Sequence, residues 1–164
     1  MILVRALLLL GLFAWGAPAS AQPDDGLRFG LTLGGISTVG IVVEAFDRHG
    51  STEVNVGTFG FRDLSLSAVR RHYLGAATAR PTVGLGLWSV IGFDVEEGER
   101  TAASLVLRAP VGVEWRPADR HALTFDINLN RGLLIRRADP SDDTPVSRRL
   151  IPLPGIAYRW WDGG

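Results

Sequence analysis

The sequence predicts an all-β protein whose eight antiparallel strands form one up-and-down barrel that spans a membrane. Three observations support this prediction. Apolar and polar residues alternate along segments such as Leu123–Asn130, so successive side chains point to opposite faces of a strand. After residue 21, no stretch approaches the length of a transmembrane helix. Several predicted strands also run ten residues or more, against roughly five or six in soluble proteins.

The first 21 residues predict a secretory signal peptide that is removed from the mature chain. Arg5 supplies a positive charge, an apolar run from Ala6 to Trp15 follows, and Ala19–Ala21 offers the small residues that signal peptidase requires. The apolar run is short and is followed by Pro18, which disfavours a membrane anchor. We therefore expect residues 22–164 to form a single exported barrel domain.

The first four predicted strands are separated by residues typical of tight turns. Asp47–Thr52 contains Asp, Gly and Ser, and Gly60–Asp63 contains Gly and Asp. The strands are predicted at Leu27–Gly35, Thr38–Phe46, Glu53–Phe61 and Leu64–Tyr73.

Most of the last four predicted strands are longer than the first four. At about 3.3 Å per residue and a tilt of about 40°, roughly ten residues cover the apolar band of about 25 Å in an outer membrane. Strand length therefore favours a lipid environment. These strands are predicted at Thr82–Phe93, Ser104–Arg116, Leu123–Asn130 and Leu150–Trp161, with a turn at Arg116–His121.

The polar face of these strands combines opposite charges with many glycines. Glycine weakens a strand that faces solvent, whereas the narrow interior of an eight-stranded barrel needs small residues beside large ones. We therefore expect the polar face to line the lumen and the apolar face to contact lipid. The alternative is a soluble lipocalin-like barrel with an interior of Leu105, Leu107, Val111 and Val113. The candidate lumen charge network comprises Glu44, Glu53, Arg71, Arg108, Glu114, Arg116 and Asp126.

Aromatic residues are predicted to form two girdles, one at each membrane interface. The periplasmic girdle comprises Phe46, Tyr73, Trp115, Tyr158 and Trp160, and the outer girdle comprises Phe59, Phe61 and Phe93. Ordinary core packing is the alternative explanation for these aromatic residues.

The last strand, Pro152–Trp161, resembles the C-terminal strand of bacterial outer-membrane β-barrels. Gly155, Tyr158 and Trp160 match the glycine and the two alternate aromatic positions of that insertion signal. Leu153 occupies a position that is usually polar, and residues 162–164 extend beyond the aromatic end. In length and strand pattern the mature chain resembles the small barrels of the OmpA transmembrane domain and OmpX. This resemblance implies a Gram-negative outer membrane, lipid neighbours and the barrel-insertion machinery as partners.

Two outward loops are long enough to bind a ligand if both termini are periplasmic. The first, Asp94–Ala103, is acidic, but its Asp94, Glu96, Glu97 and Glu99 match no defined divalent-cation site. The second, Arg131–Arg149, offers guanidinium groups that suit the phosphates of lipopolysaccharide. Its candidate contacts are Arg131, Arg136, Arg137, Arg148 and Arg149. A solvated loop base whose arginines pair with neighbouring aspartates is the simpler explanation of these side chains.

The composition and motifs indicate neither catalysis nor a cofactor. Acidic and basic residues number 17 each, so no excess of positive charge indicates nucleic-acid binding. The absence of cysteine excludes disulfides, thiolate metal sites and cysteine nucleophiles. Ser65 or Ser67 could pair with His72 only across opposite faces of one strand. We expect no enzyme, cofactor or metal site. The prediction is a structural or interaction barrel with a charge-filled lumen, and the alternatives are a narrow, porin-like passive pore and a soluble periplasmic carrier of an apolar ligand.

Overall fold

The computed structural model describes residues 26–47, 49–94, 100–137, 139, 141, 145–146 and 149–161. The predicted signal peptide lies outside these residues. No helix among the described residues is long and apolar enough to cross a membrane.

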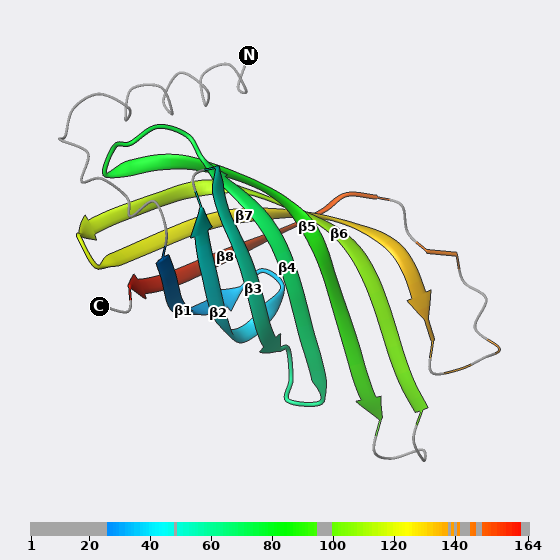
Figure 1. Ribbon diagram of the computed structural model, residues 1–164. Coiled ribbons are helices and arrows are strands. Elements are labelled where there is room, and N and C mark those ends of the chain that lie inside the picture. The colour runs from blue at the N-terminus through cyan, green and yellow to red at the C-terminus, as the bar shows by residue number, and fades with distance from the viewer. Residues whose placement is uncertain are drawn as a thin grey trace.

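The eight strands form a closed antiparallel barrel in which each strand pairs with its neighbours in sequence and β1 pairs with β8 (Figure 1). This arrangement confirms the predicted all-β, up-and-down, eight-stranded barrel. The strands are β1 (Gly26–Gly34), β2 (Ser37–Asp47), β3 (Gly50–Thr58), β4 (Asp63–Tyr73), β5 (Ala79–Asp94), β6 (Arg100–Ala118), β7 (His121–Arg136) and β8 (Ile151–Trp161).

The barrel has two distinct ends. We call the end where β1 begins and β8 finishes the terminal end, which also carries the connections from β2 to β3, β4 to β5 and β6 to β7. The opposite end is the loop end, which carries the connections from β1 to β2, β3 to β4, β5 to β6 and β7 to β8.

Most strand boundaries lie one to six residues from the predicted positions, as the end of β3, the start of β5 and the end of β7 illustrate. β3 ends at Thr58 because residues 59–62 form a turn, in which the Asp63 carboxylate accepts the N–H groups of Phe59 and Gly60. β5 begins at Ala79, three residues before the predicted Thr82. β7 continues to Arg136 through its pairing with β6, so the predicted long loop begins as strand.

Along most of the wall, side chains alternate between a mainly polar interior and a mainly apolar exterior. Residues that pair across neighbouring strands point to the same side of the sheet. The inward-facing residues of each strand therefore lie beside those of the next strand around the barrel. On the outside, Leu31, Ile41 and Phe125 expose 51%, 60% and 51% of their surface. Leu105 and Leu107 are half-buried and Val111 is exposed, so they do not form the packed apolar interior of a lipocalin-like barrel. The buried polar set includes Arg28, Glu44, Glu53, Asn55, Arg71, Thr82, Glu114, Thr124 and Arg159.

Glycines allow the strands to approach one another closely inside this narrow barrel. A Cβ atom on Gly86 of β5 would lie 2.0 Å from the carbonyl oxygen of Ala68 on β4. A Cβ atom on Gly112 of β6 would lie 2.1 Å from the carbonyl oxygen of Phe125 on β7. No side chain fits at either position without a shift of backbone, which explains the glycines on the inward face.

The wall is taller along β5, β6 and β7 than along β1 and β3. β6 contains 19 residues, whereas β1 contains nine, and the β5–β6 hairpin extends furthest at the loop end (Figure 1). The first four residues of β8 pair with β7 alone, because β1 ends opposite Gly155. Pro152 and Pro154 lie in this segment, and proline suits an unpaired strand edge because it has no N–H to leave unsatisfied.

Candidate functional site: the ion-paired lumen

The terminal-end half of the lumen is organised around two buried carboxylates, Glu44 of β2 and Glu114 of β6. Arg28 of β1 bridges them, with its Nη2 atom 2.6 Å from Glu44 Oε2 and its Nη1 atom 2.7 Å from Glu114 Oε2. Arg80 of β5 contacts the other oxygen of Glu114 at 2.7 Å. Tyr73 of β4 donates its hydroxyl hydrogen bond to Glu44. Bridging charges in this way satisfies carboxylates that have no access to solvent.

Aromatic rings close the lumen at the terminal end. The Arg28 guanidinium carbon lies 4.5 Å from the ring centre of Phe46 and 4.6 Å from that of Trp161. Arg80 lies 3.9 Å from the ring centre of Tyr73, which stacks on Phe46. The prediction that Phe46 and Tyr73 belong to an outward girdle was therefore wrong. Phe46 shares a strand face with Glu44, and Tyr73 shares one with Arg71, so both rings point inward.

The centre of the lumen is organised around Glu53 of β3 and Asp126 of β7. Arg71 of β4 lies 3.1 Å from Glu53 and 2.9 Å from Asp126. Arg159 of β8 also donates to Glu53 and lies 3.2 Å from Glu44, which links the centre to the terminal-end half. Arg108 of β6 lies 3.4 Å from Glu53. Glu53 is thus shared by three guanidinium groups.

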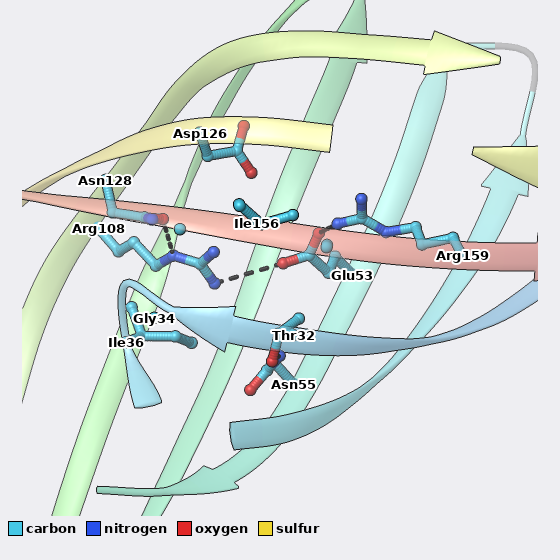
Figure 2. A pocket seen from close by; sticks show the side chains of 12 residues that line it. Thr32, Gly34, Ile36, Glu53, Asn55, Arg108, Asp126, Asn128, Ile156 and Arg159 are labelled. Carbon is cyan, nitrogen blue, oxygen red and sulfur yellow. Dashed lines mark hydrogen bonds and ion pairs between the residues drawn. The ribbon is translucent and has the colours of Figure 1, made fainter. Parts of the chain in front are cut away.

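The loop-end half of the lumen contains amide and hydroxyl groups in place of carboxylates. Arg108 marks its boundary and donates to Asn128 Oδ1 at 2.8 Å (Figure 2). Arg108 also donates to Ser67 Oγ at 2.7 Å. Asn55 Nδ2 donates to Thr32 Oγ1 at 2.9 Å. The Asn55–Thr32 bond joins two neutral groups, so it is weaker than the charge-assisted bonds that the arginines donate.

The β1–β2 turn folds into the lumen and closes the loop end. Ile36 is only 2% exposed, and its carbonyl oxygen accepts a 2.6 Å hydrogen bond from Ser65 of β4 across the barrel. Ser65 Oγ in turn accepts a 2.9 Å bond from the Trp88 indole of β5. Gly34 and Gly35 have φ angles of 71° and 73°, a conformation that glycine adopts without steric cost.

The structure places all seven residues of the predicted lumen charge network on the inward face. Six of them take part in close ion pairs, whereas Arg116 Nε lies 4.0 Å from Glu114. Sequence reasoning left three arginines out of this network, namely Arg28, Arg80 and Arg159. The alternation of side chains along the predicted strands indicates Arg28, and it also indicates Arg159, which alternates with Tyr158 and Trp160. Arg80 falls between the predicted strands Leu64–Tyr73 and Thr82–Phe93.

Of the five arginines that were predicted to contact phosphate, the structure places only two on the same strand. Arg131 and Arg136 are exposed on β7, where they pair in register with Leu107 and Ala103 of β6. Arg137 is half-buried, Arg149 is exposed, and Arg148 lies outside the described residues.

In the predicted insertion signal, Gly155 faces inward against Gly35 and Asn128. Tyr158 is exposed, and its ring packs against Trp160 and stacks on His121.

The described residues contain no cluster of three or more His, Asp or Glu side chains that could hold a metal ion. The side chains of Asp94, Glu96, Glu97 and Glu99 in the acidic loop lie outside the described part of the structure. Ser65 and Ser67 point into the lumen, whereas His72 is exposed on the opposite face of β4. The structure therefore brings no serine of this strand to the histidine.

Comparisons with models of protein families, with curated proteins and with solved structures find no match for this chain. The fold and the interior define it as a closed, eight-stranded antiparallel β-barrel with an ion-paired lumen.

Proposed function

We propose that this chain is an outer-membrane β-barrel of structural or interaction type, without catalytic activity and with a lumen that does not conduct. The observation that carries the proposal is the pairing of buried arginines and carboxylates inside a wall whose outer surface is apolar. Soluble barrels with an internal ligand site have the opposite arrangement, with apolar residues inside.

The outer surface supports a lipid environment. Exposed apolar side chains occur on all eight strands, and even the nine residues of β1 reach roughly the height of a 25 Å apolar band at a typical tilt. Trp115 and Tyr158 lie exposed towards the terminal end, and Phe59, Phe61 and Phe93 lie exposed at the loop end. These positions suit two membrane interfaces, because aromatic rings concentrate at the level of the lipid headgroups.

The closed lumen favours a structural role over a pore. The Arg28 cluster with Phe46 and Trp161 blocks the terminal end, and Ile36 blocks the loop end. Between them lies a small cavity of about 20 Å³. A passive pore needs a continuous water-filled path through the barrel. In this lumen, ion-paired side chains occupy that space. The same charged interior disfavours a carrier of apolar ligands.

The partners that we propose are membrane lipid, the barrel-insertion machinery and lipopolysaccharide. Arg131, Leu134 and Arg136 of β7 pair with Leu107, Leu105 and Ala103 of β6, which places two guanidinium groups beside apolar outward positions. Such a surface suits a lipid that carries phosphate above acyl chains. Gly155, Tyr158 and Trp160 of the last strand support recognition by the insertion machinery.

The lipopolysaccharide proposal is tested with purified mature chain in detergent. The double variant Arg131→Ala/Arg136→Ala should retain severalfold less lipopolysaccharide after size-exclusion chromatography than the wild type, because it lacks two outward guanidinium groups. Arg70→Ala is the matched control, since Arg70 is also partly exposed but pairs with Asp47. Equal retention by all three proteins would refute the assignment.

The structural role is tested by planar-bilayer recordings of the refolded mature chain, together with gel mobility before and after boiling. We expect a heat-modifiable band, as folded outer-membrane barrels resist detergent, and no defined single-channel current. Arg108→Ala should unfold at a lower denaturant concentration, because Asn128 and Ser67 lose a donor. The expected loss is about 1–3 kcal/mol, since Glu53 keeps Arg71 and Arg159.

The two readouts separate the alternatives. A stable, unitary current from the wild type would replace the structural role with a pore. A chain that remains in the soluble periplasmic fraction and shows no heat-modifiable band would favour the soluble carrier.

A further inference from the structure

A polar cavity of about 20 Å³ lies beneath the β1–β2 turn, between that turn and the central charges (Figure 2). A cavity of this size accommodates about one water molecule. Its walls come from β1, β3, β6, β7 and β8, and its polar lining side chains are Thr32, Glu53, Asn55, Arg108, Asp126, Asn128 and Arg159.

Two of the lining side chains carry buried polar atoms with no hydrogen-bond partner among the described residues. Asn55 Oδ1 is an acceptor without a donor, since the amide nitrogen alone bonds Thr32. Arg159 Nε is a donor without an acceptor in hydrogen-bond geometry, although it lies 3.2 Å from Glu44. Both residues are 1% exposed, so neither atom reaches bulk solvent. Buried polar atoms of this kind are normally satisfied by ordered water.

Three side-chain oxygen atoms lie around Gly40, next to the cavity. A Cβ atom on Gly40 would lie 2.7 Å from Thr32 Oγ1 and 3.0 Å from both Asn55 Oδ1 and Ser37 Oγ. Thr32 and Asn55 also line the cavity, whereas Gly40 and Ser37 do not. Ser37 Oγ, like Asn55 Oδ1, is buried without a partner among the described residues.

The hydrogen-bond donors and acceptors that line the cavity determine which kind of small molecule or ion it can bind. The described lumen contains six buried arginines and four buried carboxylates, which would attract a small anion. An anion, however, cannot donate to Asn55 Oδ1 and would be repelled by Glu53 and Asp126 at the cavity wall. A metal cation would be repelled by Arg108 and Arg159. Water both donates and accepts, and it carries no charge.

We propose that this cavity binds one ordered water molecule, which donates a hydrogen bond to Asn55 Oδ1 and accepts one from a guanidinium group of the lining. The water joins the neutral side chains beneath the β1–β2 turn to the charged centre of the lumen. It thereby completes the hydrogen bonding of the interior without opening a path through it.

The test is a pair of high-resolution crystal structures of the refolded mature chain, grown in sodium chloride and in sodium bromide. We expect a density peak within hydrogen-bond distance of Asn55 Oδ1 in both crystals, with no anomalous bromide signal. A bromide signal in the cavity would overturn the proposal in favour of an anion site. An empty cavity would overturn it as well.

A variant tests which group holds the water. Asn55→Leu keeps a similar side-chain volume but removes the acceptor, so the peak should be lost. Asn130→Leu is the matched control, because Asn130 is buried at the loop end but does not line the cavity, and it should retain the peak. Persistence of the peak in Asn55→Leu would contradict the assignment. If that variant does not fold, the two wild-type crystals still decide.

Discussion

The two halves of the lumen achieve closure by different chemistry. In the terminal-end half, Arg28 connects the carboxylates of Glu44 and Glu114 and is itself enclosed by aromatic rings. In the loop-end half, the hydroxyl of Ser65 donates to the backbone carbonyl of Ile36 and accepts a hydrogen bond from the indole of Trp88, and these neutral groups form the closing contact. One half is closed by ion pairs and the other by a turn.

This difference indicates how each half responds to loss of a single group. At least two arginines share each carboxylate in the charged half, so removal of one carboxylate weakens the compensation of several buried charges at once. The neutral half consists of pairwise hydrogen bonds, whose individual net contributions are smaller. We therefore expect the barrel to be most sensitive to substitution at the terminal end and at its centre.

The largest effect is expected for Glu114→Gln. This carboxylate is fully buried, and it contacts Arg28 and Arg80 at 2.7 Å with Arg116 4.0 Å away. The amide has one acceptor and turns an NH₂ group towards a guanidinium, so unfolding in urea should show a loss of about 3–5 kcal/mol.

A matched control for this change is Asp47→Asn. Asp47 also pairs with an arginine, Arg70, at 2.6 Å, but the two side chains are 49% and 35% exposed. Exposed pairs contribute little because water solvates both charges. Equal sensitivity of the two variants to urea would show that the lumen is as well solvated as the surface, and the contrast between the two halves would then fail.

Much of the barrel could be predicted because a single rule governs every strand. Alternation placed Glu44, Arg71 and Glu114 on one face from sequence alone, and the register then brings that face to the interior. The strand count followed from the turns between alternating segments. Which arginine meets which carboxylate could not be predicted, since the pairs join residues from different strands, such as Arg71 and Asp126.

Local features of the sequence explain why the prediction did not place some inward-facing residues correctly. Arg80 precedes Pro81 and lies before the predicted strand Thr82–Phe93, whereas pairing with Glu114 of β6 extends β5 back to Ala79. Phe46 and Tyr73 were assigned outward because aromatic residues near strand ends are typical of membrane girdles. Their alternation with inward charges was the better indicator.

The inward fold of the β1–β2 turn had no sequence signal. Its residues form a short, glycine-containing connection that predicts only a tight turn. Its position depends on Ser65 of β4, which is distant in sequence, and on the space that Gly155 leaves beneath Gly35. Closure of the loop end is thus a tertiary property that local pattern cannot supply.

The smallest effect is expected for Ser65→Ala, which removes the contact that holds this turn. The Ile36 carbonyl loses its donor and the Trp88 indole loses its acceptor, so the free energy of unfolding should fall by about 1–3 kcal/mol, less than in Glu114→Gln. Amide hydrogen exchange should accelerate in the β1–β2 turn and stay unchanged at Arg28 and Glu114, because the ion pairs of the terminal-end half share no hydrogen bond with Ser65. Ser89→Ala, on the outward face of β5, provides the control and should leave exchange in the turn unaltered. Faster exchange throughout the barrel in Ser65→Ala would show instead that the two halves of the lumen form one cooperative unit.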